Sequence, residues 1–483
     1  MRLFSSISIC YTLTLLACTQ TPTAEGDFTA DRAATVADSA WLTLPDRLAR
    51  IQAPTFADRD FSVVDYGASD DSLTDSRPAI LAAIAACNAA GGGRVVLPAG
   101  AWHSAGPLHL LSDVNLHLAE GARLTFSSEP ADYLPAVEVR WEGTVVYNYS
   151  PFIYAKGQRN IAITGSGTID GKARQWSMDW RKRQQADKDR LRKMGNDRLP
   201  DEQRVFADGF LDLDGDGSDD GYGDGKPHWL RPTLIEFYDC RNVLLEDFTA
   251  RNSCFWTVHP TFCTNVTIRG LQVFGSTLND DGVDPDSSTD VLIEDCYIRT
   301  HDDAISLKAG RDQDAWDRPG TSNVIVRNCR LASAVNAFCI GSEMSGGVED
   351  VFVENVRIED GKHAINFKSN LDRGGRVADV FLRDIDVDRV EESTFIFRMD
   401  YHGYRGNSFP TEFSDIYAEQ IRVGYGGKVA FKIVGVPDAP IRRVYLKDFT
   451  IDSTRVISEL LHTEDIVADA VTVGGTTWSP GAD

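Results

Sequence analysis

Two pairs of adjacent aspartates lie close together in the middle of the chain. Asp280 and Asp281 form the first pair, Asp302 and Asp303 form the second, and the alternating run "DVLIED" lies between them. Carboxylates held close together repel, which raises the pKa of one and leaves another ionised. Such a set supplies a proton donor and a proton acceptor from one residue type. Glycoside hydrolysis needs this combination, because an acid protonates the leaving oxygen while a base activates water.

Strands that would position these pairs recur along the chain. Similar β-branched runs begin at Asn242, Asn265, Asp290, Asn323, Asp350 and Asp379, at spacings of 23, 25, 33, 27 and 29 residues. A short strand pair cannot bury its face alone, whereas stacked coils can, and periods of about 20 to 50 residues are typical of solenoids. The runs have neither helices nor closely spaced hairpin turns between them. We therefore predict an all-β fold, a right-handed single-stranded parallel β-helix, rather than βαβ units or a β-sandwich.

The predicted stack would bring the two aspartate pairs together. Equivalent residues of successive coils lie about 4.8 Å apart. Asp281 and Asp302 are 21 residues apart, close to one coil, so we expect them on neighbouring rungs with Asp303 beside them. A plainer interpretation stays open at this point, because Asp-rich turns also cap strand ends and bind Ca²⁺.

A helix is expected to cover the start of the stack. The segment 74–93 has Asp75 or Ser76 as a cap, Pro78 in the first turn, and three glycines after the apolar stripe. Residues 172–229 break the strand rhythm, and we interpret them as a long inserted loop that contains a charged helix.

The inserted loop carries a candidate calcium site. Asp212, Asp214 and Asp216 have the spacing of calcium ligands. Gly223 stands where a calcium loop has its closing Glu. A structural Ca²⁺ in residues 212–220 is one possibility, and no other cofactor is expected.

Charge and cysteine usage restrict the partners and the compartment. The formal net charge of −23 argues against nucleic acid, which needs a basic surface. The run "LLAC" ends at Cys18 and is followed by Thr19, which resembles the signal of a bacterial lipoprotein sent to the outer membrane. Plain secretion is the alternative. Seven further cysteines match no zinc spacing, so buried free thiols are expected, although one disulfide stays open.

These features give a provisional division of the chain. We expect a lipoprotein signal at 1–18, an extension at 19–56, the β-helix at 57–460 and a tail at 461–483. The protein is expected to be an exported monomer, anchored in the outer membrane or held in the periplasm.

Several motifs together resemble glycoside hydrolase family 28, the polygalacturonases, in the pectate-lyase-like superfamily. "NDDGVD" at 279–284 is similar to the family motif Asn-Thr-Asp-Gly-x-Asp, and "HDD" at 301–303 is similar to Gly-Asp-Asp. "GSEMSGGV" at 341–348 resembles the bacterial branch, and "INFKS" resembles the strand that carries the family's Arg-x-Lys. The resemblance covers roughly residues 61 to 400.

The resemblance implies roles for individual residues. Asp302 would be the general acid, Asp281 and Asp303 would hold and activate water, and the reaction would invert configuration. Lys368 would bind a uronate carboxylate. Further substrate contacts are expected from neighbours of these motifs: Asn279, His301, Lys308, Arg311 and His259.

Three positions depart from the family pattern. Asn336 stands nearest the place of the catalytic histidine, Asn366 replaces the arginine, and His301 replaces the glycine before the aspartate pair. An Asn orients a hydrogen bond but takes no proton, and the loss of Arg removes a bidentate clamp. These two asparagines are retained as candidate substrate contacts.

The expected function is hydrolysis of a uronic-acid-containing, pectin-like polysaccharide, with exo action if the insert closes one end of the cleft. Two alternatives remain. One is a polysaccharide lyase on the same fold, and the other is a glycan-binding surface lipoprotein that has lost catalysis.

Overall fold

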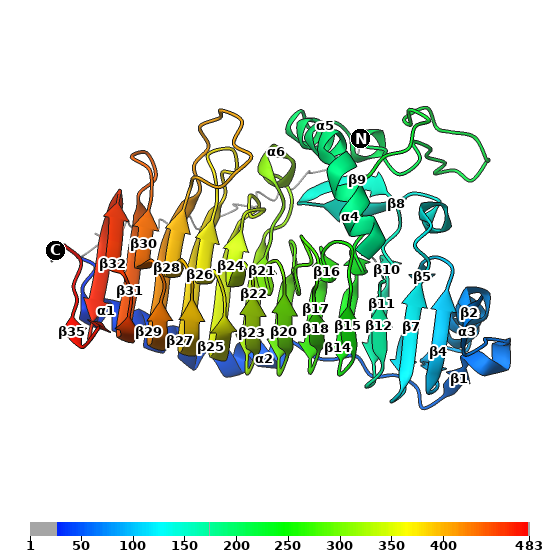
Figure 1. Ribbon diagram of the computed structural model, residues 1–483, viewed down its shortest axis with the longest axis horizontal. Helices are drawn as coiled ribbons and strands as arrows, with labels where there is room; N and C mark the ends of the chain where they lie inside the picture. Colours follow the sequence, from blue (N-terminus) through cyan, green and yellow to red (C-terminus); the bar gives the residue numbers. More distant parts are fainter. Residues whose placement is uncertain (1–26, 173, 482–483) are drawn as a thin grey trace, which may run out of the picture.

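The computed structural model describes residues 27–172 and 174–481, so the expected lipoprotein signal lies outside the described residues. The chain winds into a parallel β-helix whose strands stack in three rows along the long axis (Figure 1). This confirms the predicted fold class. No helix in the described ranges is long and apolar enough to cross a membrane.

The first row contains the strands that the repeat predicted. It runs through β1 (Asp60–Ser62), β3 (Gly93–Leu97), β6 (Val114–Leu118), β11 (Arg159–Thr164), β14 (Arg241–Glu246), β17 (Thr264–Arg269), β19 (Thr289–Glu294), β22 (Thr321–Arg327), β25 (Val348–Asp360), β27 (Arg376–Val390), β29 (Glu412–Gly426), β31 (Ile441–Ser453) and β33 (Thr463–Asp469). All six predicted strand starts fall inside this row, in β14, β17, β19, β22, β25 and β27.

The second row joins the first through the long strands β25 to β31. Its separate members are β2 (Asp71–Asp75), β4 (Gly100–Ser104), β7 (Ala122–Phe126), β12 (Thr168–Asp170), β15 (Thr249–Arg251), β18 (Gln272–Phe274), β20 (Tyr297–Thr300) and β23 (Arg330–Ser333).

The third row is split into two sheets, and the split positions the site described below. The first sheet has β5 (Leu108–His109), β10 (Ile153–Lys156), β13 (Ile235–Tyr238) and β16 (Val258–Thr261). The second has β21 (Ile305–Leu307), β24 (Asn336–Gly341), β26 (His363–Lys368), β28 (Ser393–Arg398), β30 (Val429–Val434) and β32 (Val456–Leu461).

The core is a set of apolar ladders inside the stack. One ladder pairs Val243, Val266, Val291, Val324, Val351 and Val380 on successive coils. Each of these valines is fully buried. Burial of an apolar side chain contributes about 1.5–3 kcal/mol, so the repeated apolar positions fix which side of each strand faces inward.

Both ends of the stack are covered. The predicted capping helix is present as α3 (Arg77–Ala89), with Pro78 in its first turn and Ile80 and Ile84 in the core. At the other end β34 (Thr472–Val473) and β35 (Thr476–Thr477) continue the sheet past residue 460, into the segment expected as a tail. Trp478 stacks on Phe431 with ring centroids 4.7 Å apart and closes the core there.

The segment expected as an extension contains two helices that lie along the first row, α1 (Ala30–Leu42) and α2 (Leu44–Arg50) (Figure 1). Trp41 packs edge-on against Phe352 at 5.2 Å between ring centroids, and Arg47 pairs with Asp350 at 2.8 Å. The outward aromatic side chains of the first row are therefore buried by the chain's own N-terminal segment.

The insert rises above the third row. After β12 the chain forms α4 (Arg174–Arg183) and α5 (Gln185–Asn196), two helices rather than the single one predicted, before it returns at β13. The antiparallel hairpin β8 (Val137–Trp141) and β9 (Thr144–Asn148) stands beside them (Figure 1). All seven cysteines in the described residues are free and buried, as expected.

Candidate active site

The site lies where the third row is interrupted. Between its two sheets only isolated bridges remain among the described residues. One set joins Val283 to Val258 and Ile305, and the other joins Asp286 to Thr261 and Lys308. The turns that lead into this gap come from β18 and β20, and they carry the two aspartate pairs. A break in regular strand pairing leaves room for these side chains at the outer surface of the coil.

Three of the four paired aspartates converge. Asp281, Asp302 and Asp303 each place one carboxylate oxygen within 4.8 Å of the others. The fourth, Asp280, has a different task, because its carboxylate accepts the N–H groups of Thr277, His301 and Asp302 at 2.7–2.9 Å. Asp280 therefore ties the two turns together, and the sequence does not distinguish it from its neighbour.

Asp302 and Asp303 have opposite pKa shifts. Burial and the nearby charge of Asp303 raise the pKa of Asp302. Burial also disfavours the anion of Asp303, but the charges of Lys368 and Lys308 outweigh it and lower its pKa. Asp302 therefore holds its proton to a higher pH than Asp303 does.

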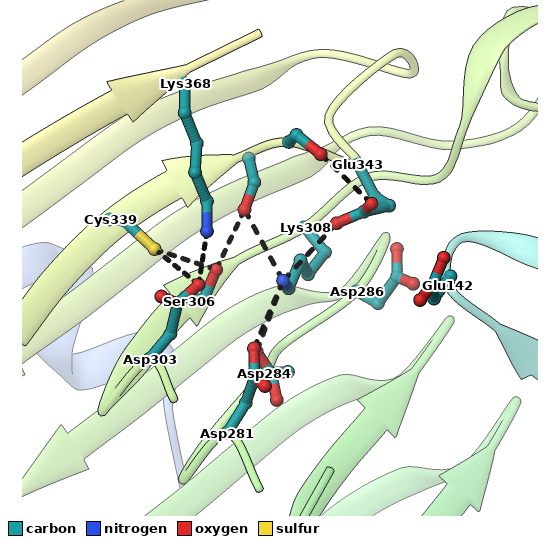
Figure 2. A network of polar contacts seen from close by, with 12 residues as sticks. Glu142, Asp281, Asp284, Asp286, Asp303, Ser306, Lys308, Cys339, Glu343 and Lys368 are labelled. Carbon is teal, nitrogen blue, oxygen red and sulfur yellow. Dashed lines mark hydrogen bonds and ion pairs between the residues drawn. The ribbon is translucent and has the colours of Figure 1, made fainter. Parts of the chain in front are cut away.

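Asp303 is held by three donors. Lys368 Nζ contacts Oδ2, and Cys339 Sγ lies 3.1 Å from the same oxygen (Figure 2). Asn336 Nδ2 donates to Oδ1. Because a carboxylate offers about four acceptor sites, one remains for a water or a substrate group.

Alternation along the third-row strands explains these contacts. In β26 the side chains of Ile365 and Phe367 enter the core, so Asn366 and Lys368 point outward. Cys339 of β24 pairs in register with Asn366, and Gly341 pairs with Lys368. Period-2 patterning therefore delivers the lysine to the aspartates.

A further buried carboxyl group, that of Asp284, lies close to Asp281. Burial and the charges of Asp284 and Asp302 raise the pKa of Asp281 well above its ordinary value. Burial raises the pKa of Asp284 to about 7, against the opposing charges of Lys308 and His259. Lys308 Nζ lies 3.5 Å from Asp281 and 3.7 Å from Asp284, between the two carboxylates and Glu343 (Figure 2). Among the three converging carboxylates, only Asp303 has a lowered pKa.

Two expected substrate contacts are buried in ion pairs. Lys308 is 2 % exposed and also lies over the ring of Trp256, 4.5 Å from its centroid. Arg311 is 4 % exposed and contacts both Glu343 and Glu142. Both line the pocket, but their charges are already engaged by carboxylates, which favours a supporting role.

Of the other expected contacts, Asn279 and His301 line the pocket and His259 does not. The Asn279 backbone N–H donates to Asp302 Oδ2 at 3.1 Å, and its side chain accepts from Arg231 at 2.7 Å. His259 is fully buried beneath the site, 3.3 Å from Asp286 and 3.6 Å from Glu236. Its position within "FWTVHP", residues 255–260, gave no sign of this burial.

The insert supplies one wall of the pocket, whose volume is about 1140 Å³. Lys188 and Arg192 of α5 both pair with Glu142 of the β8–β9 hairpin, at 2.6 and 2.9 Å. Sequence reasoning did not single out these three residues, nor Glu343, although Glu343 lies within the motif at 341–348. The spacing of four residues between Lys188 and Arg192, which puts both on one helix face, was the available signal for these two cations.

The predicted calcium ligands form a separate group. Asp212, Asp214 and Asp216 bring one carboxylate oxygen each within 4.8 Å of the others, on the surface of the insert. None of them lines the pocket. A calcium ion at this loop stays a prediction.

Comparison with known proteins identifies the family. The sequence profile of "Glycosyl hydrolases family 28" matches residues 201–466, more than half of the chain. The chain is 28% identical to a "Probable polygalacturonase" of Vitis vinifera, over 81% of this chain and 74% of that protein. It is also 28% identical to an "Exo-poly-alpha-D-galacturonosidase" of Dickeya chrysanthemi, over 77% of this chain and 64% of that protein.

A solved structure agrees with this result. The hyperthermoactive exopolygalacturonase from Thermotoga maritima superimposes with a TM-score of 0.80 at 31% sequence identity, over 89% of this chain and 96% of that chain. Family membership favours hydrolysis over the lyase alternative. The chain belongs to glycosyl hydrolases family 28 and is a glycoside hydrolase.

Proposed function

We propose that the protein hydrolyses a uronic-acid-containing, pectin-like polysaccharide from a chain end, by single displacement with inversion. The observation that carries this proposal is the group of three carboxylates in which Asp302 has a raised pKa and Asp303 a lowered one. No cofactor enters the chemistry.

In this proposal Asp302 protonates the glycosidic oxygen, since its raised pKa favours the protonated form and it is the least buried of the three carboxyl groups. Asp303 takes a proton from the attacking water through its remaining acceptor site. Asp281, whose pKa is raised well above its ordinary value, orients the water by hydrogen bonding rather than as a second base. This differs from the equal roles expected for Asp281 and Asp303.

The separation of the carboxylates bears on the stereochemistry. Oxygens within 4.8 Å are closer than the separation of about 6.5–9.5 Å that inverting glycosidases usually keep. Inversion is favoured here on another ground. An anion held by Lys368, Asn336 and Cys339 is a poor nucleophile, because its charge is already neutralised.

The pocket's charge supports an acidic substrate. Nine cationic side chains line it against five carboxylates: Arg181, Lys182, Lys188, Arg192, Lys308, Arg311, Lys362, Lys368 and Arg398 against Glu142, Asp281, Asp302, Asp303 and Glu343. This local excess contrasts with a chain whose net charge is −23. A cleft lined with positive charge concentrates an anionic substrate.

Exo action is supported by the insert. Helices α4 and α5 stand over the third row before β21, where they would stop a glycan from passing through the site (Figure 1). The similarity to exo-acting relatives agrees with this. Export belongs to the same proposal, because pectin is an extracellular polymer. A lipid anchor at Cys18 and a monomeric state stay predictions.

The decisive experiment compares wild type with Asp302→Asn on polygalacturonate. Wild type should release reducing ends without unsaturated products, and the first product seen by NMR should have the inverted anomer. The variant should lose about 10²–10⁴-fold in rate, whereas Asp388→Asn, on the far sheet, should not. Unsaturated products would support a lyase, binding without turnover would support a glycan-binding protein, and an active Asp302→Asn would refute the acid assignment.

A further inference from the structure

Strand β26 lines the active-site pocket on the side away from the insert. It follows β21 and β24 in the six-stranded sheet, whereas α4 and α5 stand before β21 (Figure 1). Three side chains of β26 line the pocket, those of His363, Asn366 and Lys368. Because Lys368 is paired with Asp303, the β26 side chains left to contact a sugar are His363 and Asn366.

Asn366 presents a hydrogen-bond acceptor to the pocket. Its side chain is 2 % exposed, and its Nδ2 donates to Asn336 Oδ1 at 2.7 Å. Asn336 in turn donates to the carboxylate of Asp303, which only accepts, so the orientation of both amides is fixed. Asn366 Oδ1 is therefore the atom left over, and within the described residues it has no hydrogen-bond partner. A buried acceptor without a partner is costly, which favours a ligand that brings a proton to it.

His363 is also neutral and unsatisfied. Burial, together with the charges of Lys362 and Arg398, lowers the pKa of His363 to about 4. Its Nδ1 is buried and has no partner in the part of the chain that the structure describes. The backbone N–H of His363 donates to the carbonyl of Val335 at 2.9 Å, and Val335 lines the pocket as well. This part of the pocket therefore combines uncharged polar atoms with an apolar side chain.

The insert offers the opposite chemistry. Arg192 of α5 uses Nη2 to pair with Glu142 at 2.9 Å, but its buried Nε has no partner among the described residues. A guanidinium N–H is a charged donor and suits a carboxylate. On the β26 side, Arg398 is already paired with Asp400 at 2.7 Å and Lys362 is exposed to solvent, where a charge binds a carboxylate weakly. The two sides of the pocket are thus built for different sugars.

We propose that the bond cleaved here joins a uronate, held on the insert side, to a neutral sugar, held against β26 with a hydroxyl group donating to Asn366 Oδ1. A hydroxyl brings a proton to this oxygen, whereas a carboxylate brings none and is repelled by it. The inference rests on the proposed function, because Asp302 has to cleave the bond. The preferred substrate is therefore a pectic polymer in which uronates alternate with neutral sugars, and an unbroken run of uronates is a slower substrate.

The test compares kcat/KM on two sets of fragments of equal length. One set comes from rhamnogalacturonan, in which galacturonate alternates with the neutral sugar rhamnose, and the other comes from polygalacturonate. The ratio of the first to the second should be about ten in wild type, the size expected for one buried hydrogen bond that a carboxylate cannot make. A wild-type ratio at or below one would overturn the inference.

Asn366→Arg places a cation where the neutral acceptor stands. It should raise kcat/KM on polygalacturonate and bring the ratio below one. The matched control is Gln272→Arg, which adds an exposed cation on β18 outside the pocket and should leave the ratio unchanged. A ratio that is the same in Asn366→Arg and wild type would refute the role of Asn366.

Asn366→Leu keeps the size of the side chain and decides the question if Asn366→Arg does not fold. It removes the acceptor without adding a charge, so the ratio should fall about tenfold. An equal loss of kcat/KM on both sets of fragments would show that Asn366 only supports the structure, and would overturn the inference.

Failure of this inference and failure of the proposed function give different results. Efficient hydrolysis of polygalacturonate alone would leave the proposed function standing and overturn the neutral-sugar assignment. If wild type is inactive on both polymers, the proposed function fails, and calorimetry of fragment binding to Asp302→Asn decides the assignment. Tighter binding of the rhamnogalacturonan fragment would then support it, and equal or weaker binding would overturn it.

Discussion

Replacing Lys368 with methionine tests the electrostatics of the site most directly. Lys368 and Asp303 are almost fully buried, with side-chain exposures of 3% and 1%. Removing one partner of a buried ion pair costs about 3–5 kcal/mol of folding free energy, because the other charge is left uncompensated. Burial already opposes ionisation of Asp303. Without the charge of Lys368 we expect burial to dominate, so the pKa of Asp303 should rise above its ordinary value of 3.8.

The sign of the pH dependence follows from this change. In wild type the lowered pKa of Asp303 contributes stability that is present above pH 3.8 and is lost as the pH falls through the folded-state pKa. The variant loses this contribution. The difference in unfolding free energy between wild type and Lys368→Met should therefore be largest near pH 7 and shrink toward pH 3, as measured by urea titration.

Activity gives the second readout. If Asp303 is the base, the acidic limb of kcat/KM moves to higher pH in Lys368→Met, and the rate falls by about 10²–10³-fold. Lys182→Met is the matched control, since Lys182 also lines the pocket but is exposed on α4. An acidic limb that stays in place would refute the assignment of Asp303, whatever the loss of rate.

Three further outcomes are expected. Burial disfavours the imidazolium of His259, but Glu236 and Asp286 outweigh it and raise the pKa of His259 to about 9. The charged imidazolium therefore contributes about 3 kcal/mol to the free energy of unfolding below pH 6.5, and this contribution is lost as the pH rises through 9. His259→Gln should abolish this pH dependence in urea titrations, and an unchanged slope would contradict the burial argument. Phe367→Ala should lower the free energy of unfolding by about 3–5 kcal/mol, because the rings of Phe367 and Phe397 stack in the core with centroids 4.3 Å apart. A decrease below about 1 kcal/mol in thermal unfolding would be inconsistent with that packing. A chelator should leave the rate of reducing-end release unchanged, since carboxylates alone carry the proposed chemistry, and a metal-restored loss would disprove this.

The stack was predictable because its information is local and periodic. Each valine of the core ladder recurs one coil after the last, and a slip by one residue would expose it. The docking of α1 and α2 was not predictable in the same way. Trp41 meets Phe352 across more than three hundred residues, and no periodicity links the two.

The site was predictable only where a motif names its residues. Asp281, Asp302, Asp303 and Lys368 come together as expected, since strand alternation and coil spacing fix where they point. Glu142 does not follow from such rules. It reaches the pocket from a hairpin and meets cations of the insert, a contact that depends on how two irregular segments pack.

Asn336 and Asn366 fix the direction of the hydrogen bonds that lead away from Asp303. Asp303 is ionised and accepts only, so Asn336 must turn its Nδ2 toward it, and Asn336 Oδ1 then accepts from Asn366 Nδ2 at 2.7 Å. Asn366 Oδ1 is left buried without a partner. Neither asparagine amide can take a proton from Asp303. The proton lost by the attacking water therefore stays on Asp303 until solvent or product removes it. The positive charge of Lys368 opposes that protonation, and regeneration of the anion after each turnover is therefore favoured by the same contact that lowers the pKa of Asp303.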